Sequence, residues 1–218
     1  MSSKKKANLI STLTAAFLAV TASVSSGCGH DPAKVTEATA KAKLIVALDT
    51  SDSPAVPALV NDVAKAVPFL PEGTFLSVLA FDSKVKPLMS EPAPASGDAF
   101  ITGITFRLEK RQAKDAGTRF DLVLPKVAAQ AHLGSCNVVV LIESDMIPDG
   151  MSRAGLRAMR AAAADLARNP RVTRVVIVGA SPKAGDVIEK YFSPLIPAKL
   201  VQYNLRSSDP EAVAGGFR

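Results

Sequence analysis

The sequence contains few of the residues that build zinc sites and disulfide frameworks. Its 218 residues include only two histidines, His30 and His132, and two cysteines, Cys28 and Cys136. Two histidines this far apart in the chain are too few for a zinc centre. Cys136 adjoins an apolar run and has no activating neighbour, so we expect a small buried residue rather than a reactive thiol. If Cys28 is acylated, Cys136 has no partner and no disulfide framework exists.

Several catalytic patterns are also missing. The sequence has no Gly-rich phosphate loop, and no arrangement of Ser, His and Asp or of Cys and His that would supply an activated nucleophile. It shows no internal repeat. After the first 28 residues it has no apolar stretch long enough to span a bilayer. We therefore expect a binding protein rather than an enzyme that uses a side-chain nucleophile.

Residues 1–28 have the pattern of a secretory signal. Three lysines at positions 4–6 precede a mostly apolar stretch at 7–21, and mostly small residues follow up to Cys28. A basic segment, an apolar core and a small-residue cleavage zone define such a signal. The small residues before Cys28 resemble the lipobox of bacterial lipoproteins, which implies that Cys28 is lipidated and becomes the first residue of the mature chain. An ordinary signal cleaved nearby, or an uncleaved anchor, is the alternative.

The resemblance to lipoproteins also implies a location. A bacterial lipoprotein carries several acyl chains, so the anchor would be firm. The residue after Cys28 is Gly29 and not an aspartate. In Gram-negative lipoproteins, the absence of an aspartate at this position points to the outer membrane. We expect an exported protein of the cell envelope, held at the outer membrane or facing the periplasm.

The basic charge of the chain comes partly from the signal. The formal net charge is +6, and without the lysines at positions 4–6 it is +3. Nucleic acid is therefore not an expected partner. About 190 residues follow the signal, enough for one domain with a single core. We expect a tether at residues 29–42, a domain at 43–206 and a C-terminal tail at 207–218.

The predicted domain alternates strands and helices, which favours an α/β fold with a doubly wound, mostly parallel central sheet and helices on both faces. We expect strands at 43–48, 74–81, 85–89, 138–142, 172–178 and 199–205, and helices at 56–67, 120–127, 152–168 and 186–192. Ser53 and Pro54 suit the start of the first helix, although Pro57 favours a later start. Residues 90–98 read as a loop. The segment 99–117 is hard to interpret, and 104–108 alternates partly as a strand does.

A carboxylate and two hydroxyls follow the first predicted strand. Asp49, Ser51 and Ser53 come directly after the apolar run at 44–48. The carboxyl ends of the strands form the ligand-binding edge of an open α/β sheet. Alternating oxygen ligands on one tight loop suit a small divalent cation.

The motif D-x-S-x-S resembles the start of the metal-ion-dependent adhesion site in von Willebrand factor type A domains. Thr118, after Gly117, matches the family's Gly-Thr element, and Asp145 matches the last aspartate, which acts on the metal through water. The resemblance implies a Rossmann-like von Willebrand A fold that binds Mg²⁺ or Mn²⁺ through Asp49, Ser51, Ser53, Thr118 and Asp145. It implies a protein partner that offers an exposed Asp or Glu. Met146 stands where the family has a glycine, directly after the last aspartate.

Other interpretations stay open. Each of these residues alone could serve a helix cap or a turn. A metal-dependent phosphohydrolase or a PIN-like nuclease would use Asp49, Glu143, Asp145 and Asp149 as a carboxylate cluster. A third possibility is a module that keeps the fold and binds through another surface. Arg153, Arg157 and Arg160 form a basic stripe on the long helix, usually a solvated face and otherwise a contact for an anionic partner.

Overall fold

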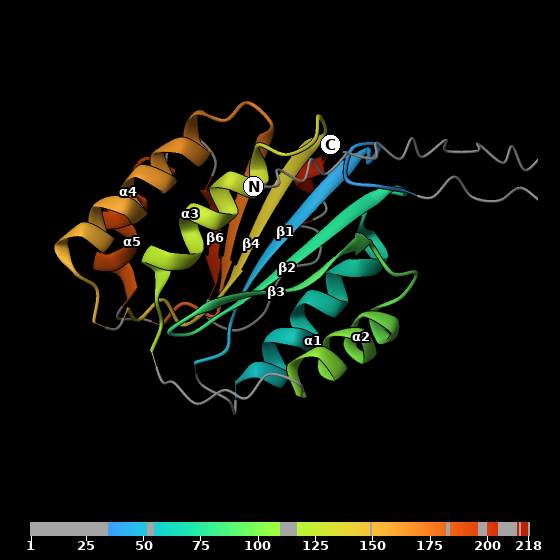
Figure 1. Cartoon of the computed structure of the whole chain (residues 1–218), viewed down its shortest axis with the longest axis horizontal. Coiled ribbons are helices and arrows are strands. Elements are labelled where there is room, and N and C mark those ends of the chain that lie inside the picture. The colour runs from blue at the N-terminus through green and yellow to red at the C-terminus, as the bar shows by residue number, and fades with distance from the viewer. Residues whose placement is uncertain are drawn as a thin grey trace, which may run out of the picture. The chain divides into compact units, whose positions relative to one another are not determined.

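The computed structural model describes residues 35–51, 55–109, 117–148, 150–181, 184–195, 200–204, 213 and 215–217. Within them lies a six-stranded sheet with the order β3-β2-β1-β4-β5-β6 (Figure 1). The strands are β1 (Ala42–Asp49), β2 (Thr74–Phe81), β3 (Val85–Pro92), β4 (Asn137–Glu143), β5 (Val172–Val178) and β6 (Leu200–Asn204). Only β3 pairs antiparallel to its neighbour. This confirms the predicted doubly wound, mostly parallel α/β sheet.

Helices cover both faces of the sheet, which explains why the middle of its central strands is apolar. Figure 1 shows α1 (Val56–Ala66) and α2 (Gly97–Glu109) on one side, and α3 (Phe120–Ala131), α4 (Arg153–Arg168) and α5 (Gly185–Phe192) on the other. All eight residues of β1 are buried. Alternate residues of β1 belong to two separate apolar clusters, one on each face of the sheet. Each fully buried Val, Leu or Ile contributes about 1.5–3 kcal/mol to folding.

The first helix begins later than Ser53 and Pro54 suggest. Its N-cap residue is Ala55, and Pro57 lies within its first two positions. A proline is tolerated there because the first amide groups of a helix have no partner within the helix. Ser53 and Pro54 lie outside the described residues. A short 3-10 turn, η1 (Val67–Phe69), ends the segment.

The segment after β3 is helical. Residues 104–108 alternate partly as a strand does, but they belong to a helix. β3 extends to Pro92, three residues into the expected loop, and α2 runs from Gly97 to Glu109. Phe100 and Ile104 are four residues apart on one helical face, and both are buried in the cluster that contains α1. Burial of this face outweighs the β-branched residues that favour an extended chain.

The amino edge of the sheet holds a buried lysine. The Lys43 side chain is fully buried; its ammonium group donates to the Glu37 carboxylate and, at 2.7 Å, to the Gln130 carbonyl. Glu37, within the predicted tether, therefore contacts the domain. Cys136 is buried at the same edge, as expected, and this burial raises the pKa of its thiol.

A short C-terminal turn also packs on the sheet. The turn η3 (Gly215–Phe217) lies against β4 and β5, and the buried Val213 joins the same apolar cluster as α1. These residues belong to the segment expected as a tail. Among the described residues, no helix is long and apolar enough to cross a membrane.

Candidate metal centre

The site is centred on the Asp49 carboxylate at the carboxyl end of β1. This side chain is buried, with 5 % of its residue surface exposed. Its Oδ1 accepts hydrogen bonds from the Ser51 amide at 3.0 Å and the Ser51 hydroxyl at 2.7 Å. The sheet ends here because Thr50 turns back onto β2, where its amide and hydroxyl both donate to the Phe81 carbonyl. This turn places the Ser51 hydroxyl on the Asp49 carboxylate.

Thr118 reaches the same carboxylate from the loop before α3. Its hydroxyl donates to Asp49 Oδ2 at 3.2 Å and lies 2.9 Å from the Ser51 hydroxyl. Gly117, just before it, has φ 143°, a left-handed conformation that favours glycine. The predicted neighbourhood of Asp49, Ser51 and Thr118 is therefore present in the structure.

An ion pair next to Thr118 fixes the start of α3. The Arg119 guanidinium donates to both carboxylate oxygens of Asp121 at 2.8 Å, and this hydrogen bonding lowers the pKa of Asp121. Gly155 of α4 packs directly on Asp121, where a Cβ atom would collide with its carboxylate. The loop that carries Thr118 is thus tied to two helices.

A serine that the sequence interpretation missed completes the cluster. The Ser144 hydroxyl donates to Asp49 Oδ2 at 2.6 Å and accepts from the Met146 amide at 3.0 Å. In the parallel pairing of β1 with β4, Leu48 lies opposite Glu143, so the next residue, Ser144, lies at the level of Asp49. Even-numbered residues of β4 share the face of the α3 cluster, but the sequence gives no signal of this, because both faces of β4 are apolar.

Asp145 lies one residue beyond this level. It is exposed, its Oδ1 accepts from the Ile147 amide at 2.9 Å, and its carbonyl accepts from the Ser181 amide. Met146 has φ 61°, a left-handed conformation that a non-glycine residue rarely adopts, and its side chain is fully buried. The backbone at Met146 therefore has the conformation that favours glycine, the residue expected there from the family pattern. A role for Asp145 through water stays a prediction.

Three further residues of the prediction lie outside the described part of the chain. They are Ser53, Asp149 and Cys28. Their predicted roles, as a metal ligand, a member of the alternative carboxylate cluster and the lipidation site, stay predictions.

Glu143 lies on the opposite face of the sheet from Asp49. It is fully buried, and neither of its carboxylate oxygens has a hydrogen-bond partner among the described residues. Burial raises the pKa of Glu143 well above its ordinary value; the nearby Asp62 raises it further, and Lys65 opposes this. Glu143 and Asp49 thus cannot face one another across a shared substrate.

The donor atoms suit a small hard cation. Asp49, Ser51, Thr118 and Ser144 offer carboxylate and hydroxyl oxygens, the ligand type that Mg²⁺ and Mn²⁺ prefer. Their hydroxyl hydrogens can rotate away and leave lone pairs for an ion. No group of three or more His, Cys, Asp or Glu side chains forms a metal cluster among the described residues. The arrangement therefore fits a metal held by one carboxylate and neutral oxygens, and the phosphohydrolase cluster finds no support in the described part of the chain.

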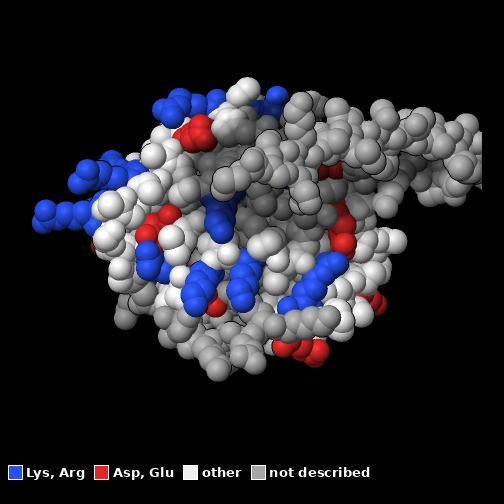
Figure 2. All heavy atoms as spheres, in the orientation of Figure 1, with Lys and Arg blue, Asp and Glu red and all other residues white. Residues whose placement is uncertain are grey.

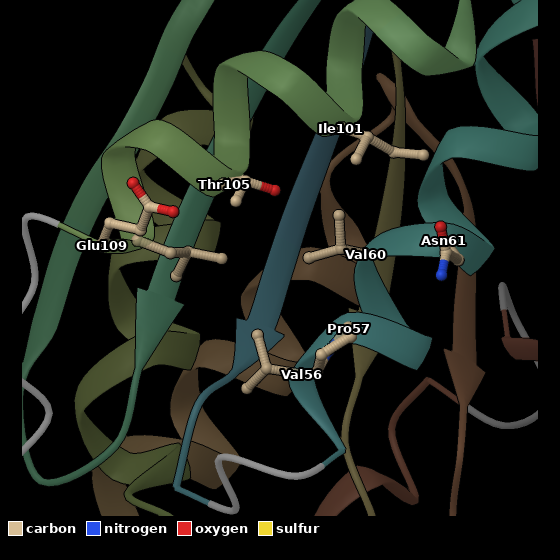
Figure 3. Close-up of a pocket in the computed structure, with 8 residues that line it drawn as sticks. Val56, Pro57, Val60, Asn61, Ile101, Thr105 and Glu109 are labelled. Carbon is tan, nitrogen blue, oxygen red and sulfur yellow. The ribbon is translucent and has the colours of Figure 1, made fainter.

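A separate groove of about 300 Å³ lies between α1 and α2 (Figure 3). Val56 and Val60 of α1 and Ile101 of α2 form the apolar part of its lining (Figure 3). The polar residues Asn61, Thr105 and Glu109 also line it. Among the described residues of this lining, Glu109 is the one ionisable group, so these residues form no acid–base pair.

The fold is that of von Willebrand factor type A domains. Similar solved structures include a von Willebrand factor type A protein from Catenulispora acidiphila, with a TM-score of 0.52 and 18% identity over 82% of this chain and 41% of that one. The PilB minor pilin from Streptococcus sanguinis has a TM-score of 0.52 and 11% identity over 82% and 60% of the two chains. An aerotolerance-related membrane protein from Bacteroides fragilis has a TM-score of 0.50 and 8% identity over 81% and 96%.

These comparisons concern the fold alone. This chain spans less than two thirds of the length of the Catenulispora protein and of the pilin. No protein-family model and no curated protein sequence matches it. Function must therefore be argued from the residues of the site.

Proposed function

We propose that this protein is an exported, lipid-anchored binding module that holds Mg²⁺ or Mn²⁺ at Asp49 and binds an acidic group of a protein partner. The observation that carries the proposal is the convergence of hydroxyls from three separate loops, those of Ser51, Thr118 and Ser144, within 3.2 Å of one carboxylate. Such a binding or adhesion role suits a von Willebrand A-like fold.

The donor set favours binding over catalysis. Asp49 is the one carboxylate among the four side chains in mutual contact, and the other three ligands are neutral. One negative charge offsets only part of a divalent charge, so the site attracts an additional anionic oxygen. An Asp or Glu side chain of a partner supplies that oxygen in the proposed complex. Ser53 and, through water, Asp145 would complete the set on the side of this chain.

Export and anchoring are part of the proposal. They rest on the signal-like residues 1–28 and on Cys28. Similar folds occur in a minor pilin and in a membrane protein, which is consistent with a place in the cell envelope. Labelling with a radioactive fatty acid tests the anchor. We expect incorporation in the parent and none in Cys28→Ser; equal labelling of both would refute acylation at Cys28.

Metal binding predicts stabilisation of the folded protein. A ligand that binds only the folded state adds about 2.7 kcal/mol when its free concentration is one hundred times its Kd. We expect Mg²⁺ or Mn²⁺ to raise the Tm of the parent, and chelation to reverse the shift. The matched control is Asp49→Asn, which keeps the shape and the acceptor oxygen but loses the charge, and we expect no shift in it. Equal shifts in both proteins, or none in the parent at millimolar metal, would refute the proposed site.

A further inference from the structure

A row of arginines runs along the exposed face of α4. Arg153, Arg157, Arg160 and Arg168 are spaced so that they share one side of the helix, and all four are exposed. Figure 2 shows basic side chains projecting from the side of the molecule where Figure 1 places α4. We call these four residues the arginine row.

The arginine row has no internal counterion in the described structure. The one acidic residue of α4 is Asp165, and its carboxylate lies 2.9 Å from the His132 ring nitrogen. No described acidic side chain forms an ion pair with Arg153, Arg157 or Arg160. Like charges three and four residues apart repel one another and weaken a helix. The row therefore costs the isolated protein some stability, which a bound anion would recover.

A shallow groove lies beside the row. Between α3 and α4 is a hollow of about 350 Å³, and alanines form most of its lining. It is lined by Pro125, Ala128 and Ala129 of α3 and by Ala158, Ala161, Ala162 and Asp165 of α4. The Asp165 carboxylate is the one acidic group in this lining, and it contacts the His132 ring. Ala158 and Ala161 each follow directly after an arginine of the row, about 100° further around the helix. The groove and the row are therefore adjacent strips of one surface.

We propose that this surface binds an acidic helix of a protein partner. Alanine side chains let the axis of an incoming helix approach closely. Glutamates or aspartates along one side of that helix would then meet the arginine row, where guanidinium groups pair with carboxylates through two parallel hydrogen bonds. A membrane surface is less suited, because the exposed large apolar residues among those described, Phe69, Phe106, Leu133 and Ile147, all lie outside α4. This proposal is independent of the metal.

The test uses a labelled helical peptide of alanine and glutamate, with glutamates spaced to match the arginine row. Binding to the full protein is followed by fluorescence anisotropy with a chelator present, so that failure of the metal proposal cannot affect it. We expect saturable binding that weakens with salt. We expect at least about tenfold weaker binding in Arg153→Ala/Arg157→Ala/Arg160→Ala, a loss equivalent to about 1.4 kcal/mol.

Two further variants separate the surface from general charge. Lys41→Ala/Lys84→Ala/Lys86→Ala removes the same charge from exposed positions elsewhere and should bind the peptide as the parent does. Ala158→Gln/Ala161→Gln fills the groove, keeps the charge and should weaken binding several-fold. The proposal is overturned if the peptide does not bind, or if both charge variants bind alike. It is also overturned if filling the groove has no effect, or if only phosphatidylglycerol vesicles or a DNA duplex bind.

Discussion

Replacing Asp49 by alanine is expected to lower the free energy of unfolding by about 2–4 kcal/mol and to abolish any response to metal. Three hydroxyls and one amide donate to this buried carboxylate. Without it, the buried hydroxyls of Thr118 and Ser144 and the half-buried donors of Ser51 lose their acceptor. Urea denaturation with and without Mg²⁺ measures both effects.

The matched control for this change is Asp186→Ala. Asp186 is exposed in the first turn of α5, so its loss should change stability by no more than about 0.5 kcal/mol. If Asp49→Ala is as stable as the control variant, the hydroxyls do not depend on this carboxylate. The site would then be a set of independent turns.

Replacing Glu143 by glutamine is expected to stabilise the protein increasingly as the pH rises. Burial raises the pKa of Glu143 in the folded state above its ordinary value of 4.5. Between the two pKa values the folded state keeps the proton and the unfolded state loses it, so the parent loses stability as the pH rises. Each pH unit in this window costs the parent about 1.4 kcal/mol. Below the ordinary pKa both states are protonated, and this effect disappears.

Urea denaturation across a pH series tests the direction of this change in stability. The difference in unfolding free energy between Glu143→Gln and the parent should grow from pH 4.5 upward. Glu72→Gln, at an exposed glutamate, is the control for the chemical change itself. A difference that stays constant with pH, or that shrinks as the pH rises, would contradict a protonated buried Glu143.

Most of the sheet could be predicted because its central strands are long apolar runs. Strands such as β1 and β4 are covered on both faces, so their central residues, 44–48 and 138–142, are all apolar and the pattern is unambiguous. The helix α2 could not be predicted, because Gly103 and the β-branched residues around it disfavour a helix. The burial of Phe100 and Ile104 against the rest of the fold favours the helix.

Within the site, the sequence identified Asp49, Ser51 and Thr118 but not Ser144. A carboxylate just after a strand is a more typical metal ligand than a serine hydroxyl, so the sequence favours Asp145 over Ser144. The register of β4 against β1 places Ser144 beside Asp49, and pairing register depends on contacts between distant segments. The burial of Glu143 is likewise a tertiary effect, because one charged residue at the end of an apolar strand does not show which face it occupies.

A titration with Mn²⁺, followed by electron paramagnetic resonance, tests the central claim most directly. Bound Mn²⁺ loses the sharp signal of the free ion, so the measurement detects binding itself, independent of stability or of a partner. We expect saturable loss of the free signal with the parent, competition by Mg²⁺, and no loss with Asp49→Asn. A parent that leaves the Mn²⁺ signal unchanged, or an Asp49→Asn variant that binds as the parent does, would contradict a metal site at Asp49.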